Sequence, residues 1–137
     1  MIVYKVVMDL NGNINATEVL PPKYVSVLAY GKARVEYKIG ETSVAPEWLA
    51  KHGYGLCAFT NHNATKFFGQ TDHRTVVLKC RAEGKIRKYE NLPLPLSLYD
   101  ISNGEKSDNL HSLGYTKGWP LDTIMCEKII PLEEVSR

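Results

Sequence analysis

The stretch that most constrains the fold is an apolar segment that ends in a polar turn. Residues Gly55-Leu56-Cys57-Ala58-Phe59 have the pattern of a buried strand. After Thr60 the chain changes period, and Ala64, Phe67 and Phe68 are spaced so that they share one face of a helix over 61–68. A strand followed directly by a short helix is therefore predicted at the centre of the fold.

A basic segment follows this unit. Apolar and mostly basic residues alternate over 76–82, Glu83-Gly84 has the composition of a turn, and 85–89 predicts a returning strand. From Arg74 to Lys88 there are six Lys or Arg residues and one acidic residue. We therefore expect a hairpin with an apolar face and a basic face. The basic face is either a phosphate-binding surface or a solvated face that keeps a sheet edge from aggregating.

Strands outnumber helices in the rest of the chain. Asn11-Gly12 is a strong hairpin signal, Pro46 to Gly53 has the start and stop residues of a short helix, and 102–118 predicts a long surface loop. The further predicted strands are 2–8, 14–20, 34–38 and 123–130, the last of them stopped by Pro131. Few connections are long enough to join parallel strands. The predicted fold is one α+β domain over 1–137, mainly an antiparallel β-sheet with two or three short helices.

Charge and hydropathy narrow the location and the partners. The net charge of the 137 residues is only +2, so overall charge does not predict binding to long nucleic acid. The chain starts without a basic region before an apolar run, and no run approaches the roughly 20 apolar residues that span a bilayer. The sequence therefore predicts a cytoplasmic protein that does not enter a membrane.

No motif for catalysis, metal binding or cofactor binding stands out. Cys57, Cys80 and Cys126 are far apart and odd in number, so we expect buried, reduced thiols rather than a zinc site. His73-Arg74-Thr75 matches one half of a two-histidine phosphodiesterase motif, but the second half is missing, and a surface histidine explains the match better. We expect no catalytic residue, no metal and no cofactor.

Several segments, taken in order, resemble a family of short phage and prophage proteins. The segments are Val3-Tyr4-Lys5-Val6-Val7, 34–40, 55–59, Ala64-x-x-Phe67, 77–84, and Gly118-Trp119-Pro120 followed by 123–126. Within that set the chain is most similar to the anti-Thoeris sponge proteins, which bind and sequester cyclic ADP-ribose-type immune signals without cleaving them. Some of these proteins also hold cyclic oligonucleotides at separate sites, and they form symmetric oligomers.

The resemblance implies a binding site as well as a function. Arg34 would bind phosphate, Phe59 would pack on the ligand, and Arg87 and Lys5 would add positive charge. A polar contact after the central helix is also implied, and we assign it to Asn63. The candidates for that contact are Asn61, Asn63 and Gln70. The implied protein is a phage-encoded homo-oligomer, a dimer or larger, which binds a small anionic cyclic nucleotide in the cytoplasm of the host cell.

Two alternatives from other functional classes remain open. One is an ADP-ribosyltransferase-like enzyme, whose nicotinamide pocket could be arranged from Arg34, Glu36, Tyr37 and Glu90. The other is a protein-binding inhibitor of a host defence complex, which should carry an exposed apolar or strongly charged patch rather than a pocket. Turnover of a bound ligand would distinguish the enzyme from the sponge.

Overall fold

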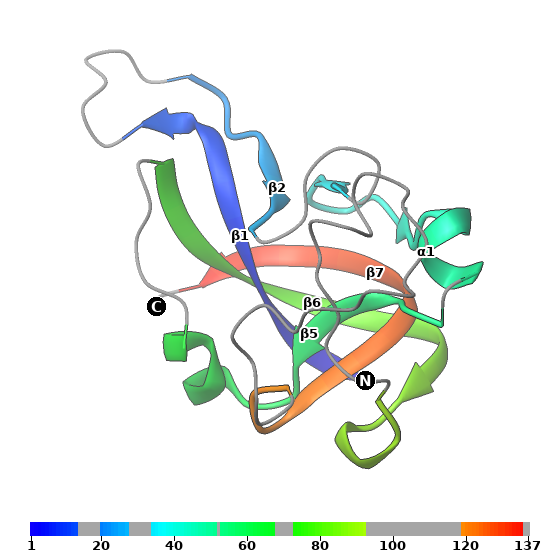
Figure 1. Ribbon diagram of the computed structural model, residues 1–137. Helices are drawn as coiled ribbons and strands as arrows, with labels where there is room; N and C mark the ends of the chain where they lie inside the picture. Colours follow the sequence, from blue (N-terminus) through cyan, green and yellow to red (C-terminus); the bar gives the residue numbers. More distant parts are fainter. Residues whose placement is uncertain (14–19, 28–33, 52, 68–72, 93–118, 136–137) are drawn as a thin grey trace, which may run out of the picture.

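Four strands form the frame of the molecule, and the computed structural model describes them within residues 1–13, 20–27, 34–51, 53–67, 73–92 and 119–135. The four are β1 (Ile2–Asn13), β5 (Leu56–Phe59), β6 (His73–Arg87) and β7 (Thr123–Val135). Both β5 and β6 pair with β1 and also with β7, and each of these pairs is antiparallel. The four strands therefore close into a barrel-like ring in which the long strands cross one another (Figure 1).

Short strands and helical segments extend this frame. The strands are β2 (Tyr24–Ser26) beside β1, β3 (Glu36–Tyr37) beside β2, and β4 (Ser43–Val44) beside β7. The helical segments are α1 (Glu47–Lys51) and the 3-10 segments η2 (His62–Phe67) and η3 (Tyr89–Asn91). A mainly antiparallel domain is thus confirmed, but the described residues hold one short α-helix and two 3-10 segments instead of two or three helices. None of the described helices is long and apolar enough to cross a membrane.

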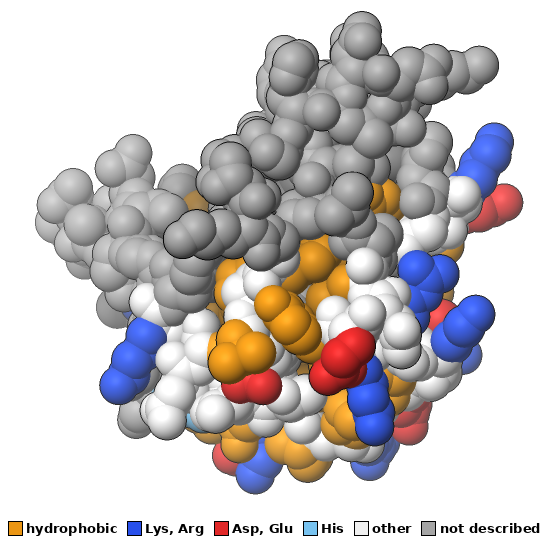
Figure 2. Space-filling model, turned by 60° about the horizontal axis from the view of Figure 1, so that its bottom comes forward, with side chains coloured by type: hydrophobic (Ala, Val, Ile, Leu, Met, Phe, Trp, Pro, Cys, Tyr) orange, Lys and Arg blue, Asp and Glu red, His pale blue; other side chains and the backbone are white. Residues whose placement is uncertain are grey.

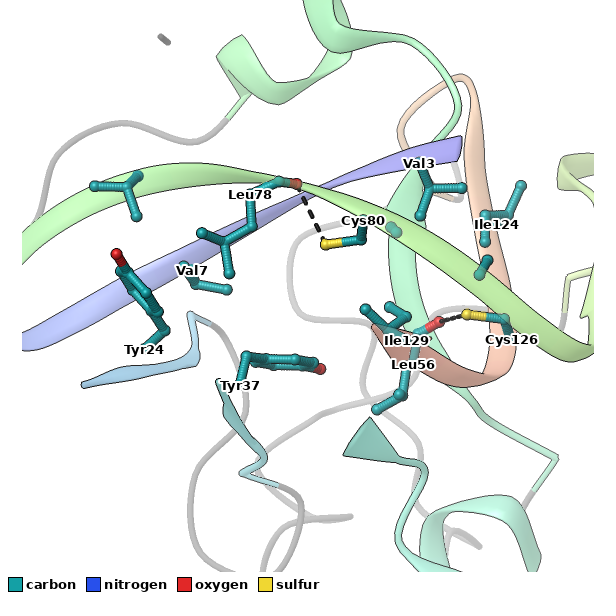
Figure 3. Packing of buried hydrophobic residues seen from close by; sticks show 13 residues of the cluster. Val3, Val7, Tyr24, Tyr37, Leu56, Leu78, Cys80, Ile124, Cys126 and Ile129 are labelled. Carbon is teal, nitrogen blue, oxygen red and sulfur yellow. Dashed lines mark hydrogen bonds between the residues drawn. The ribbon is translucent and has the colours of Figure 1, made fainter. Parts of the chain in front are cut away.

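The main core fills the inside of the ring, where side chains from the strands point toward one another (Figure 3). The thiols of Cys80 and Cys126 point into it and donate to the carbonyl oxygens of Leu78 and Leu56, at 3.4 and 3.6 Å. All three cysteines are free, as predicted, although Cys57 is only half-buried. Further members of this core are Val3, Val7, Tyr24, Tyr37, Ala58, Val76, Ala82, Ile124 and Ile129.

Two smaller clusters are buried on the other face of the same strands. One contains Leu49, Tyr54 and Met125, and the other contains Val6, Phe59 and Val77. Because side chains alternate along a strand, neighbours in sequence enter different clusters. The alternation predicted over 76–82 is confirmed, and Val77 is the fully buried apolar member of the mostly basic face.

The predicted basic hairpin is wrong, because β6 is one continuous strand of 15 residues. Its pairing with β7 continues on both sides of Gly84, from Ala82 opposite Ile129 to Arg87 opposite Met125. The register shifts between Glu83 and Ile86, where Gly84 has a φ of 77°. Glycine at positive φ serves a bulge as well as a turn, so Glu83-Gly84 bends the strand without reversing it.

Other predicted boundaries also change. β1 continues through Asn11-Gly12, so a tight turn at that dipeptide is wrong, and most of the predicted strand at 14–20 lies outside the described residues. β7 continues past Pro131, which sits beside a second register shift opposite Cys80. The helix predicted over 61–68 is the 3-10 segment η2. The predicted loop at 102–118 lies outside the described residues.

Candidate functional site

Two of the basic residues on β6, Arg74 and Arg81, are paired with acids. Arg74 lies 3.3 Å from the carboxylate of Asp9 and 2.7 Å from that of Glu134, and Arg81 lies 3.4 Å from Glu83. On the face shown in Figure 2, acidic and basic side chains lie next to each other around a group of apolar ones. The described part of that face is therefore not the uniformly basic surface that long nucleic acid requires.

Two basic residues at the end of β6 behave differently, because they line a cavity. Lys85 and Arg87 form no ion pair within the part of the chain that the structure describes. They border a cavity of about 210 Å³ whose other walls come from the turn after α1 and from β7. The principal residues of these walls are Gly53, Tyr54, Gly55, Met125, Cys126 and Glu127.

Two glycines determine the shape of the turn. Gly53 has a φ of 87°, a left-handed conformation that side chains disfavour. Gly55 lies so close to β7 that a Cβ there would stand 2.7 Å from the carbonyl oxygen of Cys126. Both glycines are therefore needed to place Tyr54 between α1 and β7.

Arg87 is anchored to this turn. Its Nη1 donates a hydrogen bond to the carbonyl oxygen of Gly53 at 2.9 Å, and the side chain is half-buried. A guanidinium has five N–H donors in a fixed plane, so one bond to the backbone leaves others for a ligand. The anchored group is a preorganised donor for an oxyanion.

The remaining lining groups supply complementary chemistry. Burial raises the pKa of Tyr54 to about 12, so its phenol is neutral at physiological pH. Tyr54 and Met125 provide an apolar wall, and Glu127 provides a carboxylate that can accept hydrogen bonds from hydroxyl groups. The cavity can thus hold a phosphate at Lys85 and Arg87, and a hydroxyl-bearing group at Glu127.

The five residues assigned from the sequence do not meet at one place. Arg87 lines the cavity, whereas Lys5 points into the main core and donates from Nζ to the carbonyl oxygen of Cys57 at 2.5 Å. Phe59 is only 5% exposed and packs in the cluster on the opposite face of the ring from Lys5. Asn63 is exposed on η2, and Arg34 is exposed just before β3. The structure therefore distributes these residues instead of joining them.

The sequence assigns neither Tyr54 nor Glu127 to a site, whereas Lys85 belongs to the basic segment that could bind phosphate. The only sequence signal at this turn is Gly53, which marks the end of the predicted short helix. Glu127 carried no signal, because its position depends on the pairing of β7 with β6 across the bulge at Gly84.

No protein-family model, no curated protein and no solved structure matches this chain. The candidate site therefore rests on the geometry of the described residues. Among those residues there is no group of three His, Cys, Asp or Glu side chains placed to hold a metal ion. For the transferase alternative, Glu36 is exposed while the adjacent Tyr37 is buried, so two of its four residues point to opposite sides of β3.

Proposed function

We propose that this chain is a phage-encoded immune-evasion protein that binds a cyclic ADP-ribose-type signal and sequesters it without cleaving it. The observation that supports this best is the cavity at the end of β6, where two cations without ion pairs in the described residues lie beside Tyr54. The sequence resemblance points to the same class of ligand and includes Arg87 in its site.

The charges of the cavity suit a diphosphate. Arg87 is held by Gly53 and can give paired hydrogen bonds to phosphate oxygens, and Lys85 adds a second positive charge. Glu127 would repel phosphate if the two met directly, so we assign it to the ribose hydroxyls. Polar groups at both ends and an apolar wall between them are typical of small-molecule sites.

The size of the cavity limits how much ligand it encloses. Its volume of about 210 Å³ lies below the roughly 300–1,000 Å³ of cavities that enclose drug-sized ligands. We infer that the phosphates enter the cavity and that the rest of the nucleotide lies at its mouth. A second copy of the chain would cover that part in the homo-oligomer we propose.

Sequestration needs binding and no chemistry. One protein site removes one signal molecule, so the free signal falls when protein exceeds signal and the dissociation constant is low. The same cavity needs no general base for this role. The protein would therefore act stoichiometrically in the cytoplasm of the infected cell.

Calorimetric titration with a cyclic ADP-ribose isomer tests the assignment of the cavity. Arg87→Met should weaken binding about 10- to 150-fold, which corresponds to losing one charge-assisted hydrogen-bonding group. Arg81→Met is the matched control, because Arg81 lies on the same strand, is exposed and contacts Glu83. If both variants were folded and bound the ligand with equal affinity, the cavity would not be the binding site.

A second comparison separates the cavity from the site implied by the resemblance alone. Arg34 does not line the cavity, whereas Lys85 does. Lys85→Met should weaken binding of the same cyclic ADP-ribose isomer. Arg34→Ala should leave the affinity unchanged if the cavity is the complete site. A loss in Arg34→Ala alone would place the ligand at the start of β3 instead.

A further inference from the structure

A lysine side chain enters the main core on the inner face of β1. Lys5 shares that face with Val3 and Val7, both fully buried. Its Nζ lies 5.4 Å from the centroid of the Tyr37 ring and donates to the carbonyl oxygen of Cys57. The Arg87 cavity does not include Lys5 among its lining residues, so Lys5 belongs to a different place in the fold.

The strand pairing leaves a break in the ring at this point. On one side β1 pairs with β5 at Tyr4 and with β2 from Val7 onward. Between these pairs, Lys5 and Val6 have no strand partner on that side within the described residues. Lys5 is half-buried, so solvent reaches part of it. At Lys5 the inner face of β1 is therefore not flanked by a paired strand on that side within the described residues.

The groups around Lys5 do not neutralise its charge. Burial alone lowers the pKa of Lys5, whereas Tyr37, Cys57 and Cys126 raise it through their ionised forms, and the net direction of the shift is upward. Burial raises the pKa of Tyr37 and of Cys57, so both are uncharged at neutral pH. Among the described residues no carboxylate forms an ion pair with Lys5. Lys5 thus lies inside the fold beside groups that carry no negative charge at neutral pH.

The hydroxyl of Tyr37 is also unsatisfied. Tyr37 is 1% exposed, and its Oη has no hydrogen-bond partner among the described residues, although Ser26 and Lys5 lie near it. Buried polar groups without partners are rare in native proteins, and an unpaired buried charge is costlier still. The Tyr37 hydroxyl therefore lies without an acceptor beside Lys5, whose ammonium uses one of its N–H groups for the carbonyl oxygen of Cys57.

We propose that the break between β2 and β5 admits an oxyanion, a phosphate or carboxylate group, that accepts hydrogen bonds from Lys5 Nζ and Tyr37 Oη. The bound group neutralises the ammonium and satisfies the phenol at once. The site is separate from the Arg87 cavity and does not depend on the proposed function. The site recognises one or two oxygen atoms of its ligand. Small oxyanions and phosphorylated metabolites both present such atoms.

Thermal unfolding in the presence of inorganic phosphate, acetate or ADP tests this site at constant ionic strength. Specific binding raises the Tm along a saturating curve, whereas general salt effects rise steadily with concentration and affect all variants alike. Lys5→Met should shift the phosphate curve to at least about tenfold higher concentration. Lys66→Met is the matched control, because Lys66 is exposed on η2, and it should behave like the wild-type protein.

Two further variants separate the possible results. Tyr37→Phe removes only the hydroxyl and should weaken phosphate binding several-fold, which provides a reading even if Lys5→Met fails to fold. Arg87→Met should retain the saturating response, because Arg87 lines the separate cavity at the end of β6. A saturating rise in Tm with phosphate and ADP but not with acetate shows that the site binds a phosphate group. An equal rise with acetate shows that it binds any small oxyanion. Identical curves for the wild-type protein and both Lys5→Met and Tyr37→Phe, or no saturating response at all, would overturn the proposal.

Discussion

Arg74 donates from Nη1 to a carboxylate oxygen of Glu134 at 2.7 Å, which joins the start of β6 to the end of β7. The other carboxylate oxygen of Glu134 accepts a hydrogen bond from Tyr24 Oη at 2.8 Å. The hydrogen bond from Arg74 lowers the pKa of Glu134, although partial burial opposes it. This link holds β2, β6 and β7 together at the end of the ring.

The lowered pKa of Glu134 predicts a pH dependence of stability. A carboxyl group whose folded pKa lies below its unfolded value of about 4.3 stabilises the fold above that value and loses this contribution as pH falls through the folded pKa. Glu134→Gln should therefore flatten the fall in unfolding free energy at acidic pH. We expect this change in the unfolding free energy to be less than about 1 kcal/mol, because the side chains of Arg74 and Glu134 are both more than a third exposed. Urea unfolding between pH 3 and 7 measures the dependence of the unfolding free energy on pH, with Glu133→Gln as control. If this dependence were the same for the wild-type protein and Glu134→Gln, the expectation would be contradicted.

The bulge at Gly84 predicts a stability difference between two glycine substitutions. Gly84→Ala meets a positive φ and would place its Cβ 2.9 Å from the carboxylate of Glu127, whereas Gly40 has a φ of 82° with open space around it. Backbone strain should destabilise Gly40→Ala and Gly84→Ala by about 1–2 kcal/mol each, and the close contact should destabilise Gly84→Ala further. Denaturant unfolding of both variants measures the difference. A hairpin turn at Gly84 with free space would make the two losses equal.

The position of Phe59 in a buried cluster predicts a structural role for its ring. Phe59→Ala should lower the unfolding free energy by about 3–5 kcal/mol, since the ring packs against Val6 and Val77. Asn63→Ala changes an exposed side chain a few residues later and should alter stability by less than about 0.5 kcal/mol. Equal stabilities of the two variants would mean that Phe59 is available to a ligand, as the resemblance implied.

The exposed apolar side chains bear on assembly. Met1, Val44 and Leu121 are 50%, 56% and 69% exposed, and each is a large apolar residue. We expect a symmetric homodimer or larger assembly that covers part of this surface. Sedimentation at tens of micromolar, with and without nucleotide, tests this. A monomer under both conditions would also remove the second copy that we place over the mouth of the cavity.

The spacing of apolar residues predicted strands correctly where the neighbouring strand did not have to be known. Val35 and Tyr37 are two residues apart in the predicted strand 34–38, and both side chains pack in the main core. The segment 55–59 was correctly predicted as a strand because its apolar residues fit a buried position with any neighbour. These predictions depended on side-chain period alone.

Long-range pairing explains what the sequence could not predict. Gly84 fits a turn and a bulge equally well, and only the continuous pairing of β6 with β7 decides between them. The same pairing brings Glu127 to the cavity beside Arg87, although the two are distant in sequence. The break at Lys5 likewise depends on where β1 leaves β5 and meets β2.

The fate of the ligand tests the central claim most directly. The protein is incubated with a cyclic ADP-ribose isomer, freed of unbound ligand, examined by native mass spectrometry and then heated to release what it holds. The account predicts about one ligand for each site, released with its mass and cyclic structure intact, and little retained by Arg87→Met compared with Arg81→Met. Conversion of the ligand by substoichiometric protein would contradict sequestration.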